Sequence, residues 1–335
     1  MKENKTEIKK PNNKWKDYLL KSGLPLEYEI VDFLESKGCI SSFEHSYLRP
    51  DENLIENEFS FDIDSSYIKE HHFFKLLIEC KYRDSSTNWL FLPAEFGGPN
   101  ELGNTSFLHP NDHFTQHIKF PFKHIELPPF AKPCLKGIEL TSDGQNPKTI
   151  TQAVNQLNYA MAEFIADDMV HQIDELLATS EIIFYNIPII VTTANLYRIK
   201  EKTTIEKIKA TDNLLDIATK EDCLVLQTNI GKDLQQHNER IFDALIKERG
   251  EKVLNLKLNS FNKEVQFVFD VIASTYCSQS MVILHHTPDN KAFESLFNLL
   301  DDIVYPSKKT LEYIESAKVR REKLFDDLKK ARMLK

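Results

Sequence analysis

The chain has 335 residues and a mass of 38.9 kDa, with 41% hydrophobic and 28% charged residues, enough to bury one large core or two closely joined ones. Its net charge is −9, yet residues 1–16 carry six Lys and two Glu (+4) and residues 307–335 carry ten Lys or Arg and five Asp or Glu (+5), which leaves −18 for residues 17–306. A body this acidic argues against a protein that coats nucleic acid. Nucleic acid would have to be held by local basic patches, by the ends or through bound cations.

Cysteine usage and apolar runs bear on the cellular compartment. The five cysteines are scattered, odd in number and never in CxxC spacing, which favours reduced thiols over a disulfide framework or a zinc knuckle. The polar, lysine-rich N-terminus lacks an apolar signal region, and apolar runs such as residues 187–191 are too short to span a bilayer. These features predict a cytoplasmic protein with neither a signal peptide nor a membrane anchor.

The first part of the chain reads as a helix followed by strands. Residues 1–22 are predicted to be a basic, weakly ordered lead-in. In the segment LPLEYEIVDFLESKG (24–38), apolar residues recur at helical spacing and a glycine ends the helix. Alternating or apolar runs then predict strands at 41–50, 57–68, 72–83 and 87–93, with the DEN triplet as a turn between the first two.

The remainder alternates helices and strands after one long segment of weak periodicity. Residues 94–147 hold many Pro, Gly and His residues with one short predicted strand at 135–140, and they are too long for an ordinary connector. The elements predicted beyond it are helix 150–177, strands 182–199 and 223–230, helices 233–248 and 263–276, strand 279–286, helix 289–303 and a basic helix at 308–332. This order predicts an α/β fold with a mixed sheet: one domain over 23–306 with an insertion at 94–147, and a helical C-terminal extension at 307–335.

The third predicted strand carries charges inside an apolar run, LLIECKYR at 76–83. Because side chains on a strand alternate between faces, Glu79 and Lys81 are expected on one face, and Ile78 and Cys80 on the other. A glutamate and a lysine are rarely buried in a central strand without a partner. The pattern therefore indicates a polar site on one face of this strand.

The preceding strand carries two aspartates under the same rule. Asp62 and Asp64 are expected on one face, away from the apolar residues Phe59, Phe61 and Ile63. If the two strands pair as a hairpin, carboxylates from both and one ammonium group converge at the same edge of the sheet.

Carboxylates gathered in this way repel one another and are costly to bury, and a divalent cation relieves both effects. Mg²⁺ or Mn²⁺ takes oxygen ligands, which Asp62 and Glu79 could supply together with the backbone carbonyl of Cys80, waters and substrate phosphates. Such a cation lowers the pKa of an attacking water, and the ammonium of Lys81 could orient that water or stabilise the phosphorane.

Asp62, the Glu79-Cys80-Lys81 triplet on an apolar strand and the preceding helix at 24–38 together resemble the PD-(D/E)xK, or restriction-endonuclease-like, nuclease superfamily. The resemblance covers about residues 24–95 and 148–200. It implies a mixed sheet flanked by helices, an acidic pair that binds Mg²⁺ and a lysine that assists hydrolysis of a phosphodiester.

The resemblance also implies supporting residues. A glutamate from the first helix often joins the metal site in this family, which matches Glu27, with Glu29 as the alternative. Some branches carry a glutamine on the helix after the lysine strand, matched here by Gln152 or Gln156, with Tyr159 beyond.

Several of these residues have a second interpretation. Asp64 could be the metal ligand in place of Asp62, and an ExK pattern on an exposed strand can be a cross-strand ion pair on a solvated face. The two glutamines, with Asn158, could orient water or could be ordinary residues of an exposed helix face. Four histidines at near-helical spacing could suggest zinc, although loop histidines on a substrate-facing insertion are the preferred interpretation: His109, His113, His117 and His124.

The resemblance implies a metal-dependent endonuclease that hydrolyses DNA, in restriction or anti-phage defence. By analogy with the family, a homodimer and a partner protein of a defence system are further expectations. Two alternatives stay open: a non-catalytic binding or assembly protein on a nuclease-like fold, which the acidic body favours, and an RNA-directed nuclease.

Overall fold

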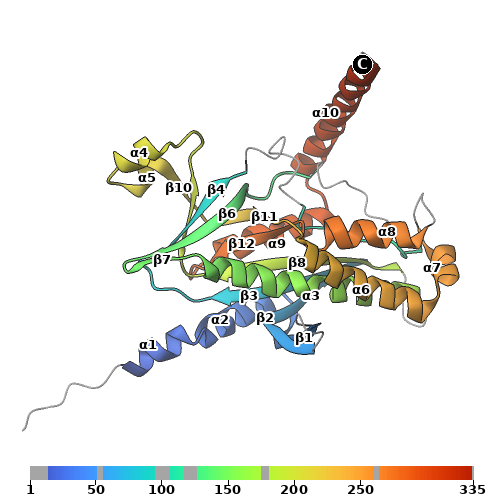
Figure 1. Ribbon diagram of the computed structural model, residues 1–335, viewed down its shortest axis with the longest axis horizontal. Coiled ribbons are helices and arrows are strands. Elements are labelled where there is room, and N and C mark those ends of the chain that lie inside the picture. The colour runs from blue at the N-terminus through green and yellow to red at the C-terminus, as the bar shows by residue number, and fades with distance from the viewer. Residues whose placement is uncertain are drawn as a thin grey trace, which may run out of the picture.

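A computed structural model describes residues 14–50, 56–94, 106–116, 127–174, 181–259 and 264–333. It has a mixed α/β architecture in which helices flank one large mixed sheet (Figure 1). The helices are α1 (Lys14–Lys21), α2 (Leu24–Ser36), α3 (Lys148–Ile173), α4 (Ile205–Lys209), α5 (Leu214–Ile217), α6 (Lys232–Arg249), α7 (Glu251–Lys257), α8 (Val265–Val271), α9 (Lys291–Val304) and α10 (Lys308–Met333), with a π-helical turn at Ile272–Tyr276.

The strands of the described residues join in the order β1-β2-β3-β8-β12-β11-β6-β4-β9-β10, with β5 paired to β8 and β7 paired to β6. Their bounds are β1 (Ile40–Pro50), β2 (Glu56–Lys69), β3 (His72–Lys81), β4 (Asn88–Pro93), β5 (Pro110–Asn111), β6 (Lys132–Thr141), β7 (Gly144–Asn146), β8 (Ile183–Thr192), β9 (Asn195–Ile199), β10 (Ala218–Glu221), β11 (Cys223–Gln227) and β12 (Ser280–His285). β1, β2 and β3 form an antiparallel meander, and β3 then pairs parallel to β8. The charged strand β3 is therefore central.

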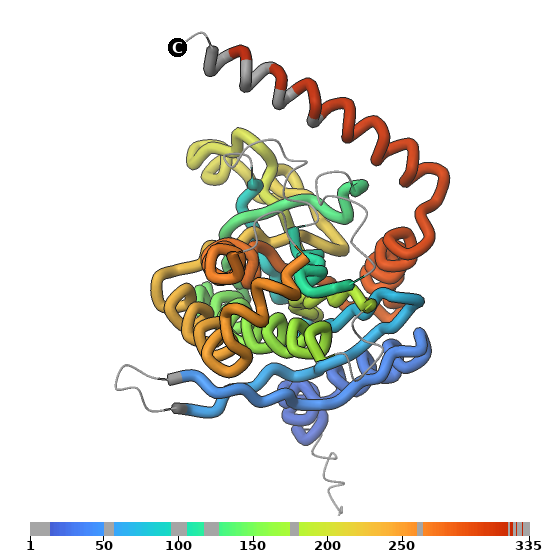
Figure 2. The backbone as a smooth tube through the Cα atoms, turned by 90° about the vertical axis from the view of Figure 1, so that its right-hand side faces the viewer, coloured from blue at the N-terminus to red at the C-terminus, as the bar shows by residue number. Residues whose placement is uncertain are grey.

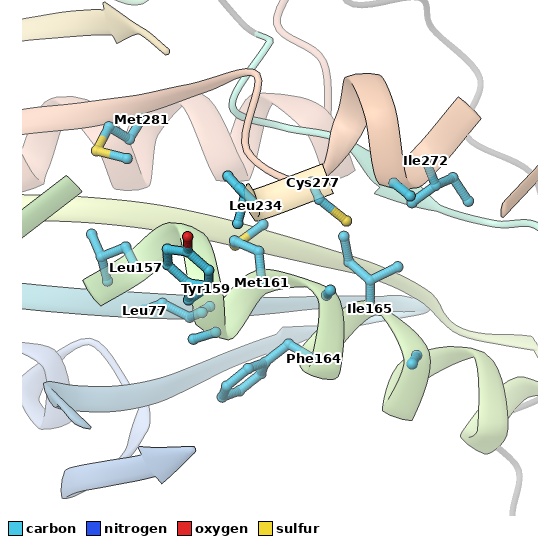
Figure 3. Packing of buried hydrophobic residues seen from close by; sticks show 14 of the residues in the cluster. Leu77, Leu157, Tyr159, Met161, Phe164, Ile165, Leu234, Ile272, Cys277 and Met281 are labelled. Atoms are coloured by element: carbon cyan, nitrogen blue, oxygen red, sulfur yellow. The ribbon is translucent and has the colours of Figure 1, made fainter. Parts of the chain in front are cut away.

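Two hydrophobic cores lie on opposite faces of the sheet. All ten residues of β8 are buried because neighbouring strands and both cores cover it, as expected where a strand has both faces covered. One core, shown in Figure 3, joins Leu77 of β3 to α3, α6 and the segment around Ile272. The other joins Ile78 and neighbouring strand residues to α2 and α9.

Most predicted elements are present, and the mixed sheet is confirmed. Residues 14–21 form helix α1 inside the segment predicted to be a weakly ordered lead-in, so that prediction is wrong there, while residues 1–13 lie outside the described part. The predicted DEN turn also lies outside it. All five cysteines are free thiols, as their spacing predicted. None of the helices in the described ranges is both long and apolar enough to cross a membrane.

The segment 94–147 is more than an insertion. Its strand β6, which includes the strand predicted at 135–140, pairs with β11 on one side and with β4 on the other. It therefore connects the two halves of the sheet, a place that the prediction of an insertion at 94–147 did not specify.

Two elements extend beyond the body. The predicted basic C-terminal helix is present as α10, which is anchored by its buried residues Thr310, Ile314 and Ala317 and then runs away from the sheet (Figures 1 and 2). The distal end of the β1–β2 hairpin also projects from the body in Figure 2.

Candidate active site

The hairpin of β2 and β3 opens at the position of the predicted metal ligands. The antiparallel ladder runs from Lys69 opposite His72 to Ile63 opposite Ile78 and ends there. Beyond that point the carboxylate oxygen Oδ2 of Asp62 accepts the backbone N–H of Cys80 at 2.6 Å, in place of a backbone carbonyl. The side chain of Asp62 is thus held against the end of β3.

The backbone of β2 changes face at Asp62. Phe61 belongs to the core beneath α3, whereas Ile63 belongs to the core beneath α2, so these two residues do not share a face. On the partner strand β1, Glu44 has a positive φ of 55° between the pairs Phe43–Ile63 and His45–Phe61. This irregular backbone is the reason why the expected strict alternation of β2 is wrong.

Glu79 is a completely buried carboxylate in the middle of this site, with an exposed fraction of 0%. Its Oε1 contacts the ammonium of Lys81, whose side chain is 22% exposed and so reaches solvent. Its Oε2 is buried and has no hydrogen-bond partner among the described residues. Leu77 belongs to one core, and Ile78 and Cys80 belong to the core on the other face of the sheet. The alternation of side chains along β3 therefore assigns Glu79 and Lys81 to the face of Leu77.

The carboxylates of the site destabilise one another in their charged forms. Burial is the main cause that raises the pKa of Glu79 to about 7; Asp62 and Glu27 raise it further, and Lys81 lowers it. Burial also raises the pKa of Asp62, against the hydrogen bond from Cys80 and the charge of Lys81. Three acidic groups and one ammonium therefore share one electrostatic environment.

Glu27 enters this environment from the first turn of α2, where Gly23 and Pro25 begin the helix. Its side chain is half-buried, and burial followed by the charge of Asp62 raises its pKa, while Lys81 lowers it. The alternative glutamate, Glu29, instead bonds the ring of His286 at 2.9 Å. The structure thus brings Glu27, and not Glu29, into the electrostatic neighbourhood of the predicted ligands.

Glu44 is a fourth acidic residue, which the sequence analysis missed. It is exposed on β1, and its charge raises the pKa of both Glu27 and Asp62. Nothing in the local pattern SSFEHSY marks it, because its position depends on the positive φ of 55° and on the pairing of β1 with β2.

Asp64, the alternative ligand, lies apart from this group. It faces His45 at 3.7 Å, and the charges that act on its pKa, after the dominant effect of burial, are those of His45 and Lys75. Lys75 in turn pairs with the buried Asp168 of α3. Asp64 therefore belongs to a neighbouring polar group that attaches β2 and β3 to α3.

Of the two glutamines predicted as supporting residues, only Gln156 contacts the strand that carries Asp62. Gln156 of α3 donates from Nε2 to the backbone carbonyl of Ser60 at 3.0 Å, two residues before Asp62, and so supports the irregular part of β2. Gln152 is exposed, one helical turn earlier. The guanidinium of Arg49 lies over the ring of Tyr159, 3.6 Å from its centroid.

The predicted histidine group is only partly described. His109 and His113 lie with ring centroids 5.9 Å apart, and His109 stacks on Tyr276 at 4.3 Å. His117 and His124 lie outside the described residues. The aromatic stacking agrees with the interpretation of these two as loop histidines.

The residues present fit a hard divalent cation in their chemistry. Within the described ranges no three His, Cys, Asp or Glu side chains converge in metal-holding geometry. The Oε2 of Glu79 is nevertheless a buried carboxylate oxygen without a hydrogen-bond partner among the described residues, and burial, with the neighbouring acids second, raises the pKa of Glu79 and of Glu27; a hard divalent cation takes such carboxylate oxygens as ligands. That the backbone carbonyl of Cys80 is a further metal ligand remains a prediction.

Comparisons with models of protein families, with curated protein sequences and with solved structures return no match.

Proposed function

We propose that this protein is a metal-dependent nuclease with a restriction-endonuclease-like core, and that it hydrolyses phosphodiester bonds of DNA. The observation that carries the proposal is the meeting of Glu27, Asp62, Glu79 and Lys81, from α2, β2 and β3, in one environment where each carboxylate's pKa responds to another charge of the group. These are the residues that the motif pattern selected. A solvated cross-strand pair would not bury Glu79 completely.

Each residue has a distinct role in this proposal. Asp62, Glu79 and Glu27 would hold Mg²⁺ or Mn²⁺. When bound, that cation would acidify a water molecule and neutralise charge on the scissile phosphate. Lys81 is partly exposed, so its ammonium can orient the attacking water or stabilise the anionic phosphorane. Gln156 holds the β2 backbone that aims Asp62.

DNA as the substrate, a role in restriction or anti-phage defence, a homodimer and a partner protein rest on the family resemblance alone. The acidic body repels nucleic acid, so the attraction would come from bound cations and from the basic ends, including α10.

The first test is cleavage of supercoiled plasmid with Mg²⁺ or Mn²⁺, with the same assay on single-stranded RNA to decide the substrate. Lys81→Ala is expected to slow cleavage at least about 100-fold, because the charge beside the reacting phosphate is lost. Lys132→Ala, which removes an exposed lysine of β6, is the matched control and keeps its activity. Undiminished cutting by the Lys81→Ala protein would contradict the mechanism.

Calorimetry separates the enzyme from a non-catalytic assembly protein. The nuclease proposal expects a Mg²⁺ or Mn²⁺ site that Asp62→Asn removes and Asp64→Asn retains, since only Asp62 shares the charges of Glu79 and Lys81. A chain that binds neither cation in this way would support the assembly function.

A further inference from the structure

Helix α1 exposes aromatic and apolar side chains instead of burying them. None of its eight residues is buried, and Trp15 and Tyr18 are 59% and 70% exposed. The beginning of α2 adds Leu24 and Tyr28, which are also exposed. Because so short a helix is barely stable by itself and α1 buries nothing, these side chains do not serve the core. Exposed apolar side chains gathered in this way typically mark a binding surface.

The charge of α1 is opposite to that of the body to which it is attached. Its sequence KWKDYLLK holds three lysines and one aspartate. Residues 1–16 carry a charge of +4, whereas residues 17–306 carry −18. The ammonium of Lys16 lies 5.8 Å from the centroid of the Trp15 ring. Ammonium groups beside exposed aromatic rings are the combination that holds the phosphates and stacks on the bases of single-stranded nucleic acid.

Helix α1 adjoins the candidate active site. It extends outward from the beginning of α2, from which two residues separate it (Figure 1). A Cβ atom at the second of these, Gly23, would lie 3.0 Å from Oε1 of Glu27, so the carboxylate of Glu27 is at the junction of the two helices. Tyr82, directly beyond β3, is close to α1 as well: its pKa is raised by burial first and then by the charges of Asp84 and Asp17.

The exposed rings favour a single strand over a duplex. The bases of a duplex are stacked on one another, so mainly its phosphates would reach α1, whereas an unpaired strand presents the faces of its bases. Trp15 and Tyr18 are three positions apart and therefore neighbours on the helix surface, where they can contact adjacent bases. An anionic lipid surface would attract the same lysines and rings, but it has no relation to the carboxylates at the junction.

We infer that α1 binds single-stranded DNA beside the candidate active site, with Trp15 and Tyr18 stacked on bases and Lys16 and Lys21 at phosphates. This inference rests on the proposed function, because the bound strand leads to the residues proposed to hydrolyse it. It narrows the substrate to DNA with an unpaired stretch.

Tryptophan fluorescence of the full chain tests the inference in EDTA, where cation-dependent cleavage does not occur. The chain has two tryptophans, and only Trp15 is exposed, since Trp89 is completely buried. A single-stranded oligonucleotide is expected to quench the fluorescence of Trp15. The same sequence as a blunt duplex is expected to bind at least about tenfold more weakly in fluorescence anisotropy of labelled DNA, because it lacks the stacking contacts.

Trp15→Ala and Tyr18→Ala should each weaken binding of the single strand at least about fivefold in the anisotropy assay, since each removes a stacked base. Both side chains are exposed, so neither substitution alters the core. Phe267→Ala is the matched control, because Phe267 is an exposed aromatic residue of α8, which lies at the opposite end of the molecule from α1 in Figure 1.

The inference is overturned if the single strand leaves the fluorescence unchanged, if the duplex binds as tightly, or if both α1 variants bind as the Phe267→Ala chain does. Quenching by anionic phospholipid vesicles, or a homodimer that the α1 variants dissociate, without binding of the single strand would also overturn it. The proposed function fails separately, in the plasmid assay, because binding in EDTA requires neither a cation nor cleavage.

Discussion

Two buried glutamates in this sheet have opposite environments. Glu139 of β6 is 3% exposed, and both its carboxylate oxygens are bonded. Its Oε2 accepts from Nε of Arg83 at 2.6 Å and from the indole N–H of Trp89 at 2.9 Å, and its Oε1 accepts from the hydroxyl of Thr149 at 3.1 Å. This carboxylate joins the end of β3, β4 and the start of α3.

Glu79, four residues before Arg83, is at least as buried but only half satisfied. One oxygen contacts Lys81, the other has no partner in the described part of the chain, and two further acids raise its pKa. A buried charge that is fully hydrogen-bonded supports the fold, whereas one left short of positive charge costs stability. Residues of the second kind are typical of functional sites, where stability is given up for reactivity.

The largest expected effect on stability is that of substituting Glu139. Glu139→Ala should lower the free energy of unfolding by about 3–5 kcal/mol, because it leaves the buried indole N–H of Trp89 unpaired and removes the anion beside Arg83. Urea unfolding of the Glu139→Ala chain measures this change. A decrease in the free energy of unfolding below about 1 kcal/mol would show that Glu139 does not stabilise the fold, and the distinction drawn between it and Glu79 would not hold.

The second prediction concerns Glu79, where a substitution is expected to raise the free energy of unfolding rather than lower it, by an amount that depends on pH. Because the folded-state pKa of Glu79 is about 7, above its ordinary value of 4.5, the folded chain holds this proton more tightly than the unfolded chain. The contribution to stability is complete below pH 4.5 and is lost as the pH rises through 7. In the presence of EDTA, Glu79→Gln should therefore be more stable than the unsubstituted chain at pH 8, by up to about 3 kcal/mol.

The same variant should match the unsubstituted chain in urea unfolding at pH 4, below the ordinary pKa of 4.5. Mg²⁺ supplies the control, since it should stabilise the unsubstituted chain at pH 8 and leave Glu79→Gln unchanged. A Glu79→Gln chain that is less stable at pH 8 would mean that Glu79, like Glu139, is a structural residue.

The smallest effect separates the two glutamines of α3. Gln156→Ala should cost about 1 kcal/mol in urea unfolding, through the lost hydrogen bond to Ser60, and should reduce plasmid cleavage by releasing the backbone before Asp62. Gln152→Ala, an exposed change one turn away, should alter neither. Equal effects of the two substitutions would show that Gln156 does not support the site.

Local patterns were sufficient for most of the elements, and they selected the residues among which the candidate site is proposed. The periodicity of 24–38 and the alternation of 57–68 predicted α2 and β2 within two residues. They did not predict α1, which has no buried residues, or the two-residue strand β5, since neither has a pattern of burial to read. The central place of β6 was also missed, because it depends on pairing with β4 and β11, which are distant in sequence.

The sequence alone determined which charges lie on the apolar strand β3 and that a hairpin brings an aspartate to them, because side-chain alternation and turn length are local properties. Only the tertiary structure decided that Asp62 rather than Asp64, and Glu27 rather than Glu29, share the environment of Glu79, and that Glu44 joins them. The reason is physical: a positive φ in β1 and a helix packed from outside the sheet set these positions, and burial, a property of the whole fold, decides how strongly the charges act on one another.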